Sequence, residues 1–250
     1  MCQNSLSNIS RIPVCRECLA EIQPSRAPQC VVCGDRLAGA TLLMGSGLCD
    51  NCRDASPEFD RALSFGEYEA GLRILIHLLK YEHATPVAAP LGKMLARASG
   101  ELVDASATPV VIPVPLHRRR RRSRGFNQSE LIARAAVKHL PRKLEVLTGA
   151  LIRQRDTISQ VGLSREERIE NVRDAFCVAQ PSPIQGRDLL LVDDVMTTGT
   201  TLSECARVLK QAGAKRVWAV TVARAFDGAS LETADPGEEE AIEVADPISF

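Results

Sequence analysis

The chain alternates between short aliphatic runs and segments in which apolar residues recur every three or four positions. In segment 68–82, Leu72, Leu75, Ile76 and Leu79 would lie on one face of a helix. Segment 189–192 is instead continuously aliphatic, as in strands buried on both faces of a parallel sheet. We predict strands at 59–67, 110–114, 144–152, 189–192 and 216–223, and helices at 68–82, 86–97, 127–140 and from 201 or 203 to 213.

Strands that alternate with helices predict an α/β fold with a parallel sheet and helices on both faces. Asn127 can cap the helix that follows it, Glu130 has capping-box spacing, and Pro141 would end that helix. Segment 154–170 is polar and unpatterned, so we expect a long loop or a mobile excursion. With its flanks it could close over a ligand as a lid; a simple exposed hairpin is the alternative.

Three CxxC pairs crowd the first fifty or so residues, at 15/18, 30/33 and 49/52. The spacing of Cys30, Cys33, Cys49 and Cys52 is that of a four-cysteine structural Zn²⁺ site, with free or redox-active thiols as the alternative. The pair at 15/18 would be a remnant, an alternative ligand pair or half of an incomplete site. We therefore expect a zinc-ribbon module at 1–57, an α/β domain at 58–226 and an acidic disordered tail at 227–250.

The composition and the first residues argue against a membrane-spanning protein and an exported protein. The 250 residues are 45% hydrophobic and carry zero formal net charge, so no global field favours nucleic acid or a membrane. No apolar run reaches the roughly 18 residues of a membrane span, so we expect no membrane insertion. The first residues do not resemble a signal peptide, which predicts a cytoplasmic protein with reduced cysteines.

The most informative stretch is VDDVMTTGTT, residues 192–201. Ligands of α/β proteins bind at the carboxyl ends of parallel strands, where this stretch is predicted to lie. A turn around Gly199 followed by a helix N-terminus offers backbone N–H groups to a phosphate, and two adjacent carboxylates suit a pair of hydroxyls or a hydrated Mg²⁺. A ribose 5-phosphate meets both requirements, with a solvated acidic corner as the alternative. The candidate residues are Asp193, Asp194, Thr197, Thr198, Gly199, Thr200 and Thr201.

A run of six arginines lies between His117 and Arg124, after another predicted strand. If the strands are parallel, this loop opens on the same edge as the two aspartates, where guanidinium groups suit a pyrophosphate. Arg124 is the best single candidate. The other arginines exceed the needs of one small ligand and could follow a single-stranded DNA backbone, with Phe126 as a stacking residue. A solvated basic loop, with Phe126 in the core, is the alternative.

These segments, taken in order, resemble the ComF family of competence proteins, also called ComFC or GntX-like. The markers are the CxxC ribbon, LLKY at 78–81, PVPL followed by RRSRGFNQ, the segment around 157–172 and VDDVMTTGTT, so the resemblance covers about residues 15–225. It implies a type I phosphoribosyltransferase-like domain beside a zinc finger and an association with natural transformation and DNA uptake. By this resemblance Asp193 and Asp194 hold the ribose hydroxyls of phosphoribosyl pyrophosphate (PRPP), and residues 197–201 hold its 5-phosphate.

Two features depart from the family pattern. Members with an elaborate zinc module often have four CxxC pairs, and this chain has three. Purine-salvage relatives have an aspartate, a candidate base, where Thr197 stands. Two functional hypotheses follow. One is a Mg²⁺-dependent phosphoribosyltransferase in which Asp193, Asp194 and Arg124 act in catalysis. The other is a non-catalytic accessory protein that binds single-stranded DNA, works with DNA-processing proteins or senses PRPP. The acceptor base and the oligomeric state stay open.

Overall fold

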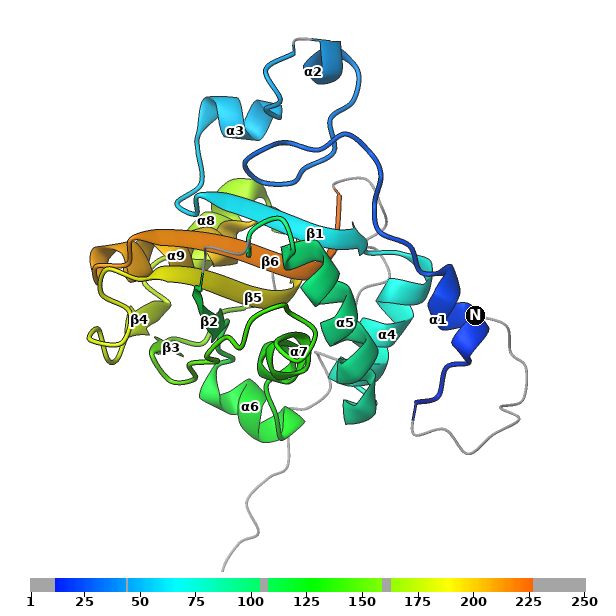
Figure 1. Ribbon diagram of the computed structural model, residues 1–250. Coiled ribbons are helices and arrows are strands. Elements are labelled where there is room, and N and C mark those ends of the chain that lie inside the picture. Colours follow the sequence, from blue (N-terminus) through cyan, green and yellow to red (C-terminus); the bar gives the residue numbers. More distant parts are fainter. Residues whose placement is uncertain (1–11, 44, 104–107, 159–162, 227–250) are drawn as a thin grey trace, which may run out of the picture.

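The central sheet has four parallel strands in the order β1-β6-β5-β2, as predicted for an α/β protein (Figure 1). The computed structural model describes residues 12–43, 45–103, 108–158 and 163–226. The strands are β1 (Arg61–Glu67), β2 (Val110–Pro113), β5 (Asp188–Met196) and β6 (Arg216–Arg224). Because all four run in one direction, their carboxyl ends lie at one edge of the sheet, and the motifs singled out above follow or occupy those ends.

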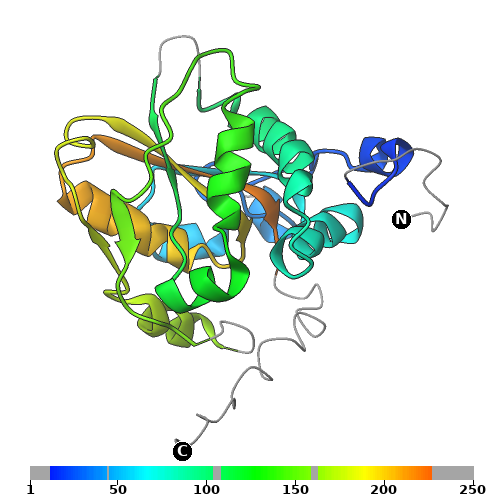
Figure 2. The same cartoon turned by 90° about the horizontal axis from the view of Figure 1, so that it is seen from below.

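Both faces of the sheet are covered, because successive side chains of each strand point to opposite sides. On one face, Leu190 and Val192 of β5 pack with residues of α4 (Ala70–Lys80), α5 (Ala88–Ser99) and α7 (Gln128–Ala136). On the other face, Leu189 and Leu191 pack with α9 (Thr200–Gln211) and with the cysteine-rich segment. Figures 1 and 2 show α5 and α7 on one side of the sheet, and Figure 1 shows α2 (Ala40–Leu43) and α3 (Asp50–Asp54) on the other.

The predicted helices are confirmed with small shifts of their ends. A short 3-10 helix, η1 (Thr85–Val87), precedes α5. Asn127 caps α7 as predicted, since its side chain accepts a hydrogen bond from the backbone N–H of Ser129. Glu130 does not complete a capping box, because its carboxylate is bonded to Arg134 one turn later at 2.9 Å. The helix ends at Ala136, earlier than the predicted end at 140.

Two segments between the sheet strands differ from the prediction. The predicted strand at 144–152 is reduced to a single bridge at Val146 and to β3 (Leu151–Arg153), because Gly149 adopts a left-handed φ of 86° between them. Segment 154–170 is not loop throughout, since α8 (Arg165–Val172) begins there with a complete capping box from Ser164 and Glu167. α8 is followed by β4 (Phe176–Val178), which pairs antiparallel with β3.

The two candidate motifs also lie in different elements from those expected. β5 extends four residues beyond the predicted end at 192, so Asp193 and Asp194 are part of the strand, paired with β6. The arginine run is not a loop but a helix, α6 (Arg118–Arg124), which ends at Gly125 with a left-handed φ of 77°. On a helix, the side chains of successive residues point to different sides, so the arginines lie on distinct faces of α6. A flexible loop would not impose this order.

The cysteine-rich segment contains three short helices: α1 (Arg16–Glu21), α2 (Ala40–Leu43) and α3 (Asp50–Asp54). Its four clustered cysteines share a buried core with Phe59, Ala62 and Met196 of the α/β part. In the described residues, no helix is long and apolar enough to cross a membrane. The predicted tail at 227–250 lies outside the described residues.

Candidate functional site

The two aspartates near the carboxyl end of β5 are each joined to a side chain from a distant part of the sequence. The Lys80 ammonium, at the end of α4, lies 2.6 Å from Asp194 Oδ2. The Ser129 hydroxyl, in the first turn of α7, donates to Asp193 Oδ1 at 2.7 Å, and the Asp194 backbone N–H donates to the same oxygen at 2.9 Å. Two helices, α4 and α7, therefore meet β5 at the paired carboxylates.

The pKa values of the two carboxylates are shifted in opposite directions. Burial and the neighbouring Asp194 charge raise the pKa of Asp193 to about 7, although its hydrogen bonds act in the other direction. Burial alone would also raise the pKa of Asp194, but the Lys80 charge and hydrogen bond outweigh it and hold this pKa below its ordinary value. The pair therefore carries one stable negative charge, on Asp194, and one carboxylate that titrates near neutral pH.

Arg124 lies close to this pair, as its proposed role requires. Its guanidinium stacks 5.6 Å from the centre of the Tyr81 ring and donates to the Gln128 side chain at 2.8 Å. Its positive charge also helps to lower the pKa of Asp194. Tyr81 directly follows Lys80, so the end of α4 contributes the Lys80 ammonium and also the aromatic ring on which the Arg124 guanidinium stacks.

The threonine loop follows β5 and leads into α9. Gly199 is the N-cap residue of α9, with φ 79°, a left-handed conformation that favours glycine. No side chain caps the helix, and the first N–H groups of an α-helix have no carbonyl partner within it. The hydroxyls of Thr198 and Thr200 lie 2.7 Å apart. The predicted loop residues 197–201 are thus gathered at a helix N-terminus, an arrangement that suits an anion.

Helix α6 divides the arginine run into two groups. Arg120 and Arg124, four residues apart, are half-buried and lie near the ionisable groups of the site, since Arg120 is one cause of the lowered pKa of Arg153. The other four arginines of the run are exposed, and no ion pair involves them among the described residues: Arg118, Arg119, Arg121 and Arg122. The run thus separates into an inner pair near the carboxylates and an outer basic surface.

Phe126 does not stand free beside these arginines. It is half-buried, packs against the core on the α5–α7 face and meets the His83 ring edge-on at 5.9 Å. The core interpretation of Phe126 is therefore the one that the structure favours over a stacking role.

The excursion between β3 and β4 is held together by hydrogen bonds between its own two halves. Arg155 donates to the backbone carbonyls of Asn171 and Arg173, and Asn171 donates to that of Ile158. Thr157, a predicted lid residue, is buried and accepts a hydrogen bond from Arg153. Arg168 is buried in α8. Gln160, also within the predicted lid, lies outside the described residues.

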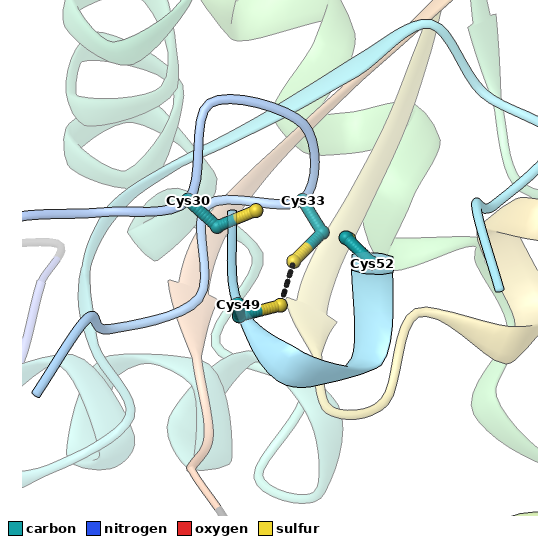
Figure 3. Close-up of side chains that lie close together, drawn as sticks. All are labelled: Cys30, Cys33, Cys49 and Cys52. Atoms are coloured by element: carbon teal, nitrogen blue, oxygen red, sulfur yellow. Dashed lines mark hydrogen bonds between the residues drawn. The ribbon is translucent and has the colours of Figure 1, made fainter. Parts of the chain in front are cut away.

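The four predicted zinc ligands converge, as Figure 3 shows. The Sγ atoms of Cys30, Cys33, Cys49 and Cys52 all lie within 4.8 Å of one another, and those of Cys33 and Cys49 are 3.5 Å apart. Four thiolates about 2.3 Å from a zinc ion stand roughly 3.8 Å from each other, so the cluster fits a tetrahedral Zn²⁺. In the described residues, no other cluster of three or more candidate ligands is present.

The CxxC motif at Cys15 and Cys18 has a different role. Cys15 precedes α1, and its thiol accepts a hydrogen bond at 3.4 Å from the Cys18 backbone N–H. Cys18 is buried against α4 and its neighbours. The pair therefore caps a helix and fills the core, and it is not part of the four-thiol cluster.

Arg224, the last residue of β6, joins the cysteine cluster to the sheet edge. It is buried, donates to the Cys33 carbonyl at 2.8 Å and lies 3.5 Å from Asp35. In the sheet it stands opposite Met196, the residue before the threonine loop. A cavity of about 500 Å³ lies between α3, the threonine loop and residues 224–226. The cysteine-rich segment therefore forms one wall of a space beside the candidate phosphate loop.

Three residues near the paired aspartates were not predicted individually from the sequence: Lys80, Ser129 and Arg153. Lys80 lies in LLKY and Ser129 directly follows RGFNQ, two of the segments that carry the family resemblance. Arg153 is tucked beside Phe176, with its guanidinium 5.3 Å from the ring centre, and Asp193 is among the groups that act on its pKa. For Lys80 and Ser129 the only signal was their position in or directly after these segments, because their partners Asp194 and Asp193 are far away in the sequence.

Comparisons with known proteins agree with this architecture. The family model "Phosphoribosyl transferase domain" matches residues 127–243. Competence protein F of Haemophilus influenzae is 31% identical over 233 residues, which cover 90% of this chain and 95% of that protein. DNA utilization protein YhgH of Escherichia coli O157:H7 is 34% identical over 175 residues, 68% of this chain and 74% of that protein.

Solved structures give a weaker likeness. A hypoxanthine phosphoribosyltransferase of Staphylococcus aureus is 18% identical over 56% of this chain and 62% of that chain, with a TM-score of 0.33. The parallel sheet and the family match together show the type I phosphoribosyltransferase fold. By its similarity to competence protein F and YhgH over most of its length, the chain belongs to the ComF family.

Proposed function

We propose that the chain binds PRPP at the carboxyl edge of β5 and β2, as a cytoplasmic protein with a role in DNA uptake. The 5-phosphate would bind the N–H groups and hydroxyls of residues 197–201, and the ribose hydroxyls would bind Asp193 and Asp194. Arg124 would face the pyrophosphate, which brings Mg²⁺ with it. The observation that carries the proposal is the continuity of β5: paired carboxylates lead, within one strand, into a left-handed glycine turn at an uncapped helix N-terminus.

If the protein is an enzyme, it is a phosphoribosyltransferase that displaces pyrophosphate from C1 of the ribose. Arg124 would then stabilise the negative charge of the departing pyrophosphate, and the aspartates would hold the sugar as positive charge develops on it. Thr197 cannot act as a general base in the way a carboxylate can. The acceptor therefore has to bring a nitrogen that needs no strong base, or lose its proton to another group.

Calorimetric titration with PRPP, with and without Mg²⁺, tests the binding. We expect saturable binding of one PRPP per chain, stronger with Mg²⁺, and a loss of roughly tenfold or more in Asp194→Asn, which removes a charged acceptor. Exposed Asp54→Asn in α3 is the matched control. Absence of binding by the wild-type chain would refute the proposal. Release of pyrophosphate in the presence of candidate bases then distinguishes an enzyme from a PRPP sensor.

A second candidate function rests on the outer face of α6. Four exposed arginines on one short helix form a basic surface that suits a phosphate backbone, and relatives are named for competence and DNA utilization. On this alternative the chain is a non-catalytic accessory that binds single-stranded DNA beside DNA-processing proteins. An electrophoretic shift that weakens with salt and is lost when the four outer arginines become alanine would support it. An unchanged shift in that variant would refute it.

The divided arginine run makes the two functions separable. The outer residues Arg118, Arg119, Arg121 and Arg122 can be replaced while Arg120 and Arg124 stay in place. We expect such a variant to keep its PRPP affinity and to lose DNA binding, whereas Arg124→Ala should weaken PRPP binding. If both variants lose both ligands equally, the division of α6 into two faces has no functional meaning.

A further inference from the structure

The ion pair between Lys80 and Asp194 is a buried contact at the centre of the candidate ribose site. Lys80 ends α4 and Asp194 lies in β5, and their side chains are 19% and 6% exposed. The Lys80 Nζ and Asp194 Oδ2 atoms are 2.6 Å apart, the distance of a close ion pair. A contact of this kind fixes both groups at one place relative to the sheet edge.

The pair remains charged despite its burial. Burial alone would lower the pKa of the Lys80 ammonium, but the negative charge of Asp194 outweighs it and raises this pKa above its ordinary value. An ammonium has three N–H donors, so a lysine paired with one carboxylate still has donors for a ligand. Because the Lys80 side chain is partly exposed, a hydroxyl that approaches Asp194 from solvent also comes within reach of a cation.

The arrangement differs from an open pair of metal-ligating carboxylates. Mg²⁺ requires nearly octahedral oxygen ligands at about 2.1 Å. Here Asp194 Oδ2 is held by an ammonium, and Asp193 Oδ1 by the Ser129 hydroxyl and a backbone N–H. The positive charge that a divalent ion would supply beside these carboxylates is already provided by the protein itself.

We infer that Lys80 is a ligand-binding residue of the ribose subsite: it orients Asp194 and donates a hydrogen bond to a sugar hydroxyl oxygen. The ribose 5-phosphate part of the ligand then binds without a divalent cation, and Mg²⁺ acts only through the pyrophosphate. This inference rests on the proposed PRPP site and deepens it, since it assigns to Lys80 a role that the motif residues alone do not contain.

Ribose 5-phosphate is the suitable probe, because it has the sugar and the phosphate but no pyrophosphate. We expect the wild-type chain to bind it with affinities that agree within about twofold in Mg²⁺ and in excess EDTA. Lys80→Met should lower the affinity by about 10- to 100-fold, the usual effect of removing a hydrogen bond to a charged group. Lys80→Arg keeps the charge and should recover part of it, and Lys93→Met, at an exposed position of α5, should bind as the wild type.

A second comparison covers the case in which Lys80→Met does not fold, since it leaves Asp194 buried without its cation. Asp194→Asn removes that charge, and Lys80→Met/Asp194→Asn removes both. We expect the double variant to bind ribose 5-phosphate at least about tenfold more weakly than Asp194→Asn. Equal affinities of these two variants, or of Lys80→Met and the wild type, overturn the inference.

The outcomes also separate this inference from the proposed function. If the wild-type chain binds PRPP but binds ribose 5-phosphate only with Mg²⁺, or not at all, the role of Lys80 is wrong and the PRPP site stands. If it binds neither compound under any condition, both are wrong. A loss in Lys93→Met as large as that in Lys80→Met would also refute a specific role for Lys80.

Discussion

The cysteine cluster and the carboxylate edge are both buried and both suit a cation, but they are assembled in different ways. The four thiols come from two CxxC turns that are close in sequence, and the cation they fit must come from outside. The two aspartates are adjacent in sequence, and their cation, Lys80, is part of the chain and comes from another helix. The first site therefore depends on metal supply, and the second depends on correct tertiary packing of α4 and α7.

Among the predicted effects on stability, the loss of metal from the cysteine cluster should be the largest. A structural Zn²⁺ contributes on the order of 10 kcal/mol of binding free energy, much of it to folding of the small module that holds it. We expect Cys30→Ser to lose zinc, to lower the thermal unfolding temperature and to expose the module to proteolysis. Metal analysis and thermal unfolding measure both effects.

Cys15→Ser is the matched control for that experiment, because Cys15 caps α1 and is not part of the cluster. We expect it to retain one zinc per chain. Retention of zinc by Cys30→Ser, or loss of zinc from Cys15→Ser, would show that the ligand set has been assigned incorrectly.

Disruption of the internal cation should have the next largest effect. Lys80→Met leaves a carboxylate buried without its partner, a change that typically costs about 3–5 kcal/mol of unfolding free energy. The double variant Lys80→Met/Asp194→Asn removes the charge as well, so most of this loss should be recovered. Urea unfolding of the two variants measures the difference. Equal destabilisation would mean that the ion pair is not the cause.

The raised pKa of Asp193 predicts a dependence of stability on pH. Its folded-state value of about 7 lies above the ordinary value of 3.8, so the protonated form is favoured by folding. The resulting stabilisation is present below the ordinary pKa and is lost as the pH rises towards the folded-state pKa. Each pH unit in that interval removes roughly 1.4 kcal/mol of unfolding free energy. Asp193→Asn can still accept from Ser129 but does not titrate.

We therefore expect the stability of Asp193→Asn, relative to the wild type, to improve between pH 5 and pH 8. Urea unfolding at the two pH values, at constant ionic strength, gives this difference directly. A relative stability that stays constant, or that declines with rising pH, would contradict the electrostatic account of the aspartate pair.

The smallest effect concerns the glycine turn. Gly199→Ala puts a side chain on a left-handed residue, at a cost of about 1 kcal/mol, with no close clash because the new Cβ would lie 3.5 Å from Met196. Gly186 has a similar φ of 66° and open space around it, so Gly186→Ala has the same backbone cost away from the site. Both variants should lose similar stability in thermal unfolding, and only Gly199→Ala should lose PRPP affinity.

How much the sequence could predict differs between the two sites for a physical reason. The convergence of Cys30, Cys33, Cys49 and Cys52 was predicted completely, because a CxxC turn is a local structure and its spacing is sufficient. At the carboxylate edge the aspartates and threonines were predicted, but Lys80 and Ser129 were not, since no local spacing links them to Asp193 or Asp194. Only the packing of α4 and α7 against β5 brings these groups together.

The same distinction applies to the fold. Strands and helices with a clear period were predicted well, including the parallel sheet. The errors fall where local signals compete: a left-handed Gly149 interrupts the apolar segment 144–152, and the capping box of Ser164 and Glu167 starts a helix within a polar segment that has no apolar stripe. The arginine run was taken for a loop because it follows the end of a predicted strand, although arginine is a good helix former.

A structure of the chain with ribose 5-phosphate tests the central claim most directly. The account predicts the phosphate against the backbone N–H groups of residues 197–201, and the two ribose hydroxyls within hydrogen-bond distance of Asp193, Asp194 and the Lys80 ammonium. A sugar phosphate bound elsewhere, or one whose hydroxyls point away from β5 while the Lys80–Asp194 contact stays closed, would contradict it.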